Sequence, residues 1–150
     1  MISRYEMLSS ATAEISRLIA KISAAEMKRY GLRGTWARYL IALREYNSDI
    51  TAAKLSVISA RNKADVSRAL SELEEHGLVK RVSGGNYRVR VTLTDKGREI
   101  ADALHARAVD LIKFAGKDIS DGERDILYRS LASLMKNLEE ISKRHGTTVT

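Results

Sequence analysis

The sequence contains no cysteine. This absence excludes disulfide bonds, thiolate catalysis, zinc sites with cysteine ligands and redox sensing by cysteine. Proline is also absent, so no residue forces a helix to break, and only 9 of the 150 residues are glycine. Tryptophan and phenylalanine occur once each, as Trp36 and Phe114. We therefore expect no row of aromatic side chains of the kind that stacks on single-stranded nucleic acid.

Long apolar runs are missing too. No run in the sequence approaches the roughly 18 residues that a transmembrane helix needs. The first residues, Met1 to Met7, lack the apolar core of a signal peptide. We expect a soluble, cytoplasmic protein with no membrane partner.

The residue types that enzymes and metal sites require are not grouped in the sequence. His76, His105 and His145 are widely separated, and no other ligand lies near them at metal-binding spacing. An acidic cluster at residues 121–125 is explained by the preference of helix N-termini for negative charge. No nucleophile paired with a base and no phosphate-binding Gly-Lys-Ser/Thr motif is visible. We expect neither an enzyme nor a bound cofactor or metal.

Positive charge is in excess. Lys and Arg number 26 against 19 Asp and Glu, which gives a formal net charge of +7. Such a basic chain favours a polyanionic partner, either nucleic acid or an anionic membrane surface, and charge alone does not separate the two. Hydrophobic residues make up 44% of the chain, enough to build the core of one domain with or without an added oligomerisation element.

Three long helices are predicted from apolar residues that recur at steps of three and four. They cover residues 5–29, 95–116 and 121–144. The last has a coiled-coil-like seam of Leu127, Leu131, Leu134, Leu138 and Ile141. The apolar stripes could pack on one another within one chain or pair between two copies. Because a separate module lies between them in the sequence, we favour pairing between two copies, and hence a homodimer.

A set of shorter elements lies between these helices. Short helices are predicted over residues 35–46 and 51–58, the latter with Leu55 and Ile58 facing inward. Another helix starts after Asn62, a residue type that favours the N-cap position. The buried stripe of this helix is predicted to be Val66, Leu70 and Leu73.

Two strands follow, where the apolar spacing changes to every second residue. They cover residues 79–83 and 87–93 and are joined by a glycine-rich turn. The face predicted to be buried consists of Tyr87, Val89, Val91 and Leu93. The opposite face carries Arg88 and Arg90 and is predicted to be exposed. The hairpin has four charged residues, all basic: Lys80, Arg81, Arg88 and Arg90. They could simply protect an edge strand from aggregation, but we favour DNA contact because like charges crowded on a small hairpin repel each other without an anion.

A short helix, a tight turn, a second helix and a basic hairpin together predict a winged helix-turn-helix over residues 33–94. In that fold the second helix enters the major groove of double-stranded DNA, and the hairpin contacts the backbone or the minor groove. The residues predicted to contact DNA are Arg61, Lys63, Ala64, Asp65, Ser67, Arg68 and Ser71 on the helix and Arg81, Asn86, Arg88 and Arg90 on the hairpin. Arg68 can contact guanine, and Arg61 and Lys63 beside the positive helix end suit a phosphate.

Four stretches resemble a known family, the MarR family of transcriptional regulators. Residues 62–81, NKADVSRALSELEEHGLVKR, resemble its recognition helix and the strand that follows. Residues 91–97, VTLTDKG, resemble the exit of its last strand into the fifth helix, and residues 30–32 and 36–43 resemble the entry to its second helix. The resemblance covers nearly the whole chain. It implies a single, mainly α domain over residues 1–150, with a small β-hairpin wing.

The resemblance also implies how the molecule works. Dimerisation helices are expected at residues 5–30 and 95–145, and the dimer is expected to bind a palindromic operator. Members of the family are often released from DNA by a small, commonly phenolic, anionic ligand, so a small aromatic or anionic effector is expected here.

The wing departs from the family pattern. Members usually carry an aspartate and an arginine two residues apart near the wing tip, where this chain has Gly85 and Tyr87. The wing is also about two residues shorter than the family's wing. Either Arg88 or Arg90 substitutes for the missing arginine, or the wing contacts only phosphates.

The sequence therefore predicts a sequence-specific, ligand-responsive regulator of transcription, acting as a repressor. Two alternatives stay open. One is an architectural DNA-binding protein with little sequence preference, and the other is a module that uses the winged fold to bind another protein.

Overall fold

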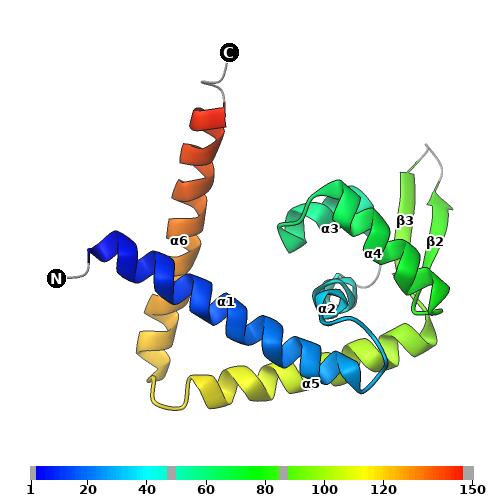
Figure 1. The fold of residues 1–150 in the computed structure, drawn as a ribbon, viewed down its shortest axis with the longest axis horizontal. Helices are drawn as coiled ribbons and strands as arrows, with labels where there is room; N and C mark the ends of the chain where they lie inside the picture. Colours follow the sequence, from blue (N-terminus) through cyan, green and yellow to red (C-terminus); the bar gives the residue numbers. More distant parts are fainter. Residues whose placement is uncertain (1–2, 47–49, 85–87, 147–150) are drawn as a thin grey trace. The chain divides into compact units, whose positions relative to one another are not determined.

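The computed structural model describes residues 3–46, 50–84 and 88–146. Its elements, shown in Figure 1, are α1 (Arg4–Lys28), a 3-10 turn (Gly34–Trp36), α2 (Ala37–Glu45), β1 (Ile50–Thr51), α3 (Ala52–Ser59), α4 (Lys63–Glu75), β2 (Val79–Gly84), β3 (Arg88–Leu93), α5 (Asp95–Ala115) and α6 (Asp121–Gly146). The chain forms two compact units, residues 1–107 and 108–150, with the boundary within α5. We describe each unit by itself.

Most helices in the described residues begin at a side-chain cap, including the cap predicted at Asn62. The Asn62 side chain accepts a hydrogen bond from the Asp65 amide at the start of α4, and Thr51 accepts one from the Lys54 amide at the start of α3. α1 opens with a capping box, in which Ser3 and Glu6 each bind the other's backbone N–H. Each cap satisfies an N–H group that has no partner inside the helix, which fixes where the helix starts.

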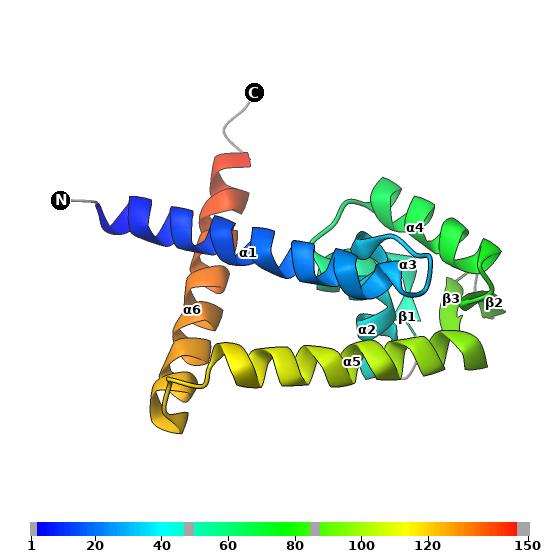
Figure 2. The same ribbon diagram turned by 60° about the horizontal axis from the view of Figure 1, so that its bottom comes forward.

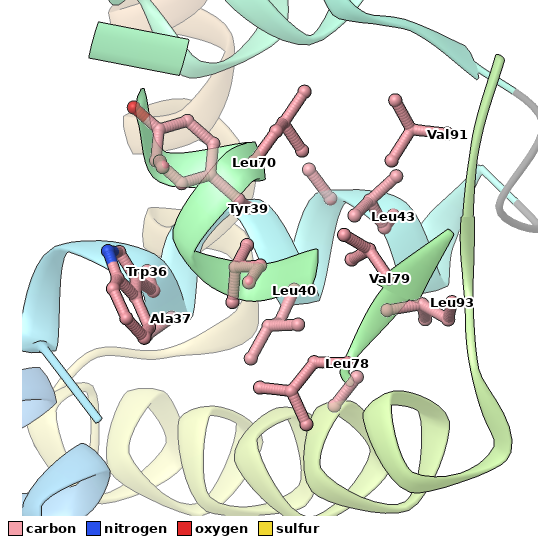
Figure 3. Close-up of a cluster of buried hydrophobic side chains, with 14 of the residues drawn as sticks. Trp36, Ala37, Tyr39, Leu40, Leu43, Leu70, Leu78, Val79, Val91 and Leu93 are labelled. Atoms are coloured by element: carbon pink, nitrogen blue, oxygen red, sulfur yellow. The ribbon is translucent and has the colours of Figure 1, made fainter. Parts of the chain in front are cut away.

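The core of the first unit lies between α2, α3, α4 and the sheet, and the first half of α5 runs beneath α2 (Figures 2 and 3). The predicted stripe of α4 is confirmed, since Val66, Leu70 and Leu73 are all buried. The other large side chains that are fully buried are Met27, Leu40, Leu43, Leu55, Leu78, Val79 and Val91. Each such side chain contributes roughly 1.5–3 kcal/mol of hydrophobic stabilisation. The core therefore holds α4 and the sheet in fixed positions.

Two burial predictions are wrong. Ile58 is 36% exposed, because the inward side of the short helix α3 is filled by Leu55 and by Ser59, whose hydroxyl donates to the Leu55 carbonyl at 2.6 Å. Val89 is 47% exposed, whereas Val91 on the same face of β3 is buried. The core covers only the base of the hairpin. The alternation of apolar and polar residues along β3 continues beyond that base, so it predicts burial where there is none.

A third strand was not predicted. β1 pairs antiparallel with β3 through Ile50 opposite Val91 and Thr51 opposite Arg90, and the order in the sheet is β1-β3-β2. Two residues are too few to show an alternating pattern. The extra strand ties the start of α3 to the wing, which joins both halves of the predicted DNA-binding module.

The junction between the wing and α5 is tightly built. The Thr94 hydroxyl donates to the Gly77 carbonyl at 2.6 Å and accepts from the Gly97 amide at 3.0 Å, so Thr94 caps α5. A Cβ atom at Gly97 would lie 1.9 Å from the Leu78 carbonyl oxygen, so only glycine allows this approach. These contacts fix the base of the wing against the first turn of α5.

Ion pairs join α5 to α1 and to α2 within the first unit. Arg107 on α5 donates to Glu26 on α1 at 3.0 Å, and this hydrogen bond lowers the pKa of the Glu26 carboxyl. Arg44 on α2 contacts Asp102 on α5 with an Nε–Oδ1 distance of 2.5 Å. These pairs are at least partly exposed, so each stabilises by no more than about 1 kcal/mol.

Apolar stripes on α1 and α6 remain exposed to solvent. On α1 the exposed side chains include Leu8, Ile15, Leu18 and Ile22. On α6, in the second unit, they include Leu127, Leu134, Leu138 and Ile141. Among the helices that the structure describes, none combines the length and the apolar character needed to cross a membrane.

Candidate nucleic-acid interface

The turn between α3 and α4 is fixed by hydrogen bonds from both sides. Ala60 adopts a left-handed conformation with φ of 51°, which reverses the chain after α3. Arg38 of α2 donates to the Ser59 carbonyl at 2.7 Å, and the Ser56 hydroxyl donates to the Arg61 carbonyl. These contacts orient the start of α4 relative to α3, the relation that defines a helix-turn-helix.

The outward face of α4 carries the side chains that the sequence predicts. Lys63, Ala64, Ser67 and Arg68 are exposed, and Asp65 and Ser71 are partly buried. Arg68 is 75% exposed and is the only long side chain in the middle of this face. The small neighbours leave room for a base edge to approach the helix closely.

Asp65 links the cap of α4 to Arg68. The Asn62 side-chain amide donates to Asp65 Oδ2 at 3.0 Å, and Arg68 Nη2 donates to Asp65 Oδ1 at 2.5 Å. The Asp65 backbone N–H in turn donates to Asn62 Oδ1 at 2.8 Å. The three side chains form a continuous hydrogen-bonded chain over the first turn of the helix.

A hollow of about 360 Å³ lies beside this turn. It is lined by Arg33, Thr35, Trp36, Tyr39, Arg61, Asp65, Arg68, Ala69 and Glu72. Arg33 Nε lies 3.6 Å from Glu72 Oε2, so two of the three guanidinium groups face carboxylates. The lining has one more positive than negative charge, which suits an anionic surface.

The sheet register divides the wing into two faces. Val79, Arg81 and Ser83 share the face of Val91 and Leu93, which packs toward the core. Lys80, Val82 and Arg90 lie on the opposite, more exposed face, and the register places Arg88 at a position on that same face. The outer face is therefore basic, as predicted. Asn86 lies outside the described residues.

Arg81 is directed toward α4. Its guanidinium donates to the Ser71 hydroxyl at 3.0 Å and to the Ser67 carbonyl at 3.4 Å. Its Nε lies 3.6 Å from Glu74 Oε2, and its backbone N–H donates to Glu74 Oε1 at 3.3 Å. Arg81 thus bridges the wing and α4, which are the two elements predicted to contact DNA.

Several residues of this region were not singled out from the sequence. They are Arg33, Arg38, Glu72 and Glu74, whose contacts hold the exposed residues in place. The sequence did contain an indication of the Arg81–Glu74 pair. Arg81 lies two residues after buried Val79 on β2, so the two side chains are on the same face of the strand, the face directed toward the helix.

His76 and Glu123 make contacts that stabilise local structure. The His76 ring packs edge-on against Trp36 with centroids 5.1 Å apart, and its Nδ1 lies 2.8 Å from the Glu72 carbonyl. Glu123 binds Ser120 at the start of α6 as a capping box. Within residues 3–46, 50–84 and 88–146, no group of three or more His, Asp or Glu side chains is placed to hold a metal ion.

Comparisons with known proteins identify the fold. No family model and no curated protein sequence matches the chain. The transcriptional regulator SlyA is 24% identical with a TM-score of 0.82, over 89% of this chain and 94% of that one. A Listeria monocytogenes protein, classed as a MarR family transcriptional regulator and solved with a 26mer DNA, is 22% identical with a TM-score of 0.85, over 94% and 95%. A MarR transcriptional regulator from Methanosarcina mazei Go1 is 22% identical with a TM-score of 0.81, over 93% and 94%.

These similarities establish the fold of MarR-type regulators, which the sequence resemblance predicted. The fold is mainly α-helical, with the small antiparallel sheet that forms the wing.

Proposed function

We propose that this protein is a transcriptional regulator that binds double-stranded DNA. The observation that carries the proposal is the outward face of α4, where small side chains surround exposed Arg68 beside a basic wing face. A helix held in this way, with its buried stripe locked into the core, can enter a major groove as a rigid body. The Listeria protein of the same fold was solved with DNA, which supports the proposal.

Each predicted contact has a physical role in this arrangement. Arg68 would donate two hydrogen bonds to the O6 and N7 atoms of a guanine, while Ala64 and Ser67 allow the close approach. Arg61 and Lys63 lie at the positive N-terminus of α4 and would bind a phosphate. Arg88 and Arg90 would bind the backbone or enter the minor groove, and Arg81 and Ser71 complete the predicted surface.

The proposal includes a homodimer, in which a second copy covers the exposed stripes of α1 and α6. The separation of the two stripes by the winged module, together with the seam spacing of α6, supports pairing between copies. Two modules related by a two-fold axis would bind half-sites about 34–36 Å apart on a palindromic operator.

The proposed regulator acts as a repressor that a small aromatic or anionic ligand releases from its operator. The support for this part is the family resemblance. The chain is proposed to act in the cytoplasm, where its operator is accessible.

The test compares two duplexes over a range of salt. One duplex is recovered from fragments of the source genome by the full-length protein, and the other is a scrambled duplex of the same composition. A sequence-specific regulator binds the first at least about 1000-fold more tightly at physiological salt. Both affinities fall with salt, because phosphate contacts release counterions.

The two alternative functions give different results in the same titration. Equal affinity for both duplexes at every salt concentration would identify an architectural protein. Absence of binding to any duplex in low salt would identify a module that binds protein.

A further inference from the structure

A carboxylate on a DNA-binding surface needs an explanation. Asp65 lies in the first turn of α4, between Lys63 and Arg68, where a phosphate is expected to approach. A negative charge there repels the DNA backbone and so weakens binding to every sequence. The side chain must do something that offsets this repulsion.

Asp65 contacts Asn62 through both its side chain and its backbone. Its Oδ2 accepts from the Asn62 amide at 3.0 Å, and its backbone N–H donates to Asn62 Oδ1 at 2.8 Å. Both contacts are local to the helix cap, so they form wherever α4 forms. The remaining oxygen, Oδ1, is left directed at Arg68, to which it is bound.

Arg68 has no other fixed contact in the part of the chain that the structure describes. An arginine side chain that is 75% exposed has several rotatable bonds, and free rotation would be lost on binding DNA. The ion pair through Nη2 restricts the orientation of the guanidinium group before DNA arrives. Its other N–H groups stay available for two parallel hydrogen bonds.

The same ion pair discriminates between the two acceptors that DNA offers. The edge of guanine is neutral, so it can bind Arg68 while Asp65 stays in place. A phosphate is an anion, so Asp65 repels it even where N–H groups of Arg68 are available to bind it.

From this geometry we infer that Asp65 is a specificity-determining residue. It positions Arg68 to contact a base, and it weakens the competing contact of Arg68 with phosphate. The inference rests on the proposed function, because it assumes that α4 binds DNA.

The test uses Asp65→Asn in the full-length protein, a change that keeps the shape of the side chain and removes its charge. The probes are the duplex that the wild-type protein selects and its scrambled counterpart. We expect binding to the scrambled duplex to strengthen about threefold, and the ratio of the two affinities to fall about tenfold, within the range that one base contact supplies. A selection from a random-sequence library should show at which base position Arg68→Ala loses its preference. Asp65→Asn should show a weaker preference at that same base position.

Two controls separate this role from general effects. Glu75→Gln removes a carboxylate from the exposed last residue of α4, and it should leave the affinity ratio unchanged. In an Arg68→Ala background, Asp65→Asn should strengthen binding to both duplexes equally. Asp65→Ser removes the same charge with a different side chain and should repeat the result if Asp65→Asn does not fold.

Each remaining outcome overturns a defined part of the inference. An unchanged affinity ratio in folded Asp65→Asn would show that Asp65 does not set specificity. An equal fall of the ratio with and without Arg68 would show that Asp65 does not act through Arg68. Failure of the wild-type protein to bind any duplex would overturn the proposed function itself. That result is distinguishable from the two above, in which the wild-type protein binds DNA.

Discussion

Gly97 shows how one residue fixes the position of the wing. The first turn of α5 touches the chain at Leu78, where β2 is about to begin, and this approach leaves no room for a side chain. Thr94 binds across the same junction to the Gly77 carbonyl. Any group larger than hydrogen at residue 97 must push the two segments apart.

Gly97→Ala should therefore destabilise the protein strongly. Its Cβ would lie 1.9 Å from the Leu78 carbonyl oxygen, so the backbone must shift. We expect a loss of about 3 kcal/mol in the free energy of unfolding. Thermal unfolding followed by circular dichroism should show a midpoint lower by about 6–12 °C.

Gly122→Ala is the matched control. Nothing lies within 4 Å of a Cβ atom at residue 122, which is in the first turn of α6. Because alanine favours helix more than glycine does, this variant should unfold at or slightly above the wild-type temperature. If Gly97→Ala were as stable as Gly122→Ala, the close approach at Leu78 would not exist in solution.

Residues fixed by spacing alone were predicted well. The buried stripe of Val66, Leu70 and Leu73 and the Asn62 cap follow from helix geometry and local hydrogen bonding. Contacts between distant residues were not predicted, because they depend on tertiary placement. Arg81 appeared in the sequence as one more basic residue of the wing, whereas its contacts with Ser71 and Glu74 require α4 and β2 to lie side by side.

At the scale of elements, prediction from sequence fails in two cases. One is an element too short to show a periodic pattern, and the other is a strand whose alternating pattern continues beyond its buried part. β1 was missed because a strand of two residues has no period. The buried face of β3 was extended to Val89 because alternation continues beyond the edge of the core. The order of the helices and the hairpin was predicted correctly, since each is long enough for its own pattern and each ends at a cap or a turn.

The wing should contribute affinity and little sequence preference if it contacts only the backbone. Replacing Arg88 and Arg90 together by alanine would remove two charges from its outer face. If these arginines bind phosphates, the affinity of the variant for the selected duplex and for the scrambled duplex should fall by the same factor. The slope of log K against log salt should become shallower by about one for each phosphate that the wing no longer binds. Fluorescence anisotropy at a series of salt concentrations measures this slope.

A control for net charge is available on α6. Replacing Arg129 and Lys136 together by alanine removes the same charge from exposed positions outside the winged module. This variant should change the slope much less. A wing variant with the wild-type slope would show that the two arginines do not contact phosphate, and a weakening confined to the selected duplex would instead indicate base contact in the minor groove.

At the scale of the whole molecule, the exposed apolar stripes call for a partner. A winged module with a single recognition helix contacts only one half-site, and a single contact of this size gives limited affinity. Linking two modules in a dimer makes the second contact intramolecular, which raises overall affinity by about 100- to 10,000-fold. Dimerisation and DNA affinity should therefore change together when a stripe is altered.

Leu138→Glu tests this coupling. Leu138 is 57% exposed and lies in the seam of α6, so two-fold pairing of copies would bury a carboxylate without a partner. We expect the dissociation constant of the dimer to rise at least tenfold, as measured by sedimentation equilibrium. Affinity for the palindromic duplex should fall with it, while affinity for a duplex with one half-site should not change.

Ala132→Glu adds the same charge on the opposite side of α6, where the residue is exposed and outside the seam. Alanine and glutamate both favour helix, so the helix itself should be unaffected. This variant should remain a dimer with wild-type affinity for the palindrome. If Leu138→Glu also remained a dimer, the seam of α6 would not be the interface. If it became a monomer yet bound the palindrome as tightly as the wild-type protein, the two modules would act independently and the operator would need only one of them.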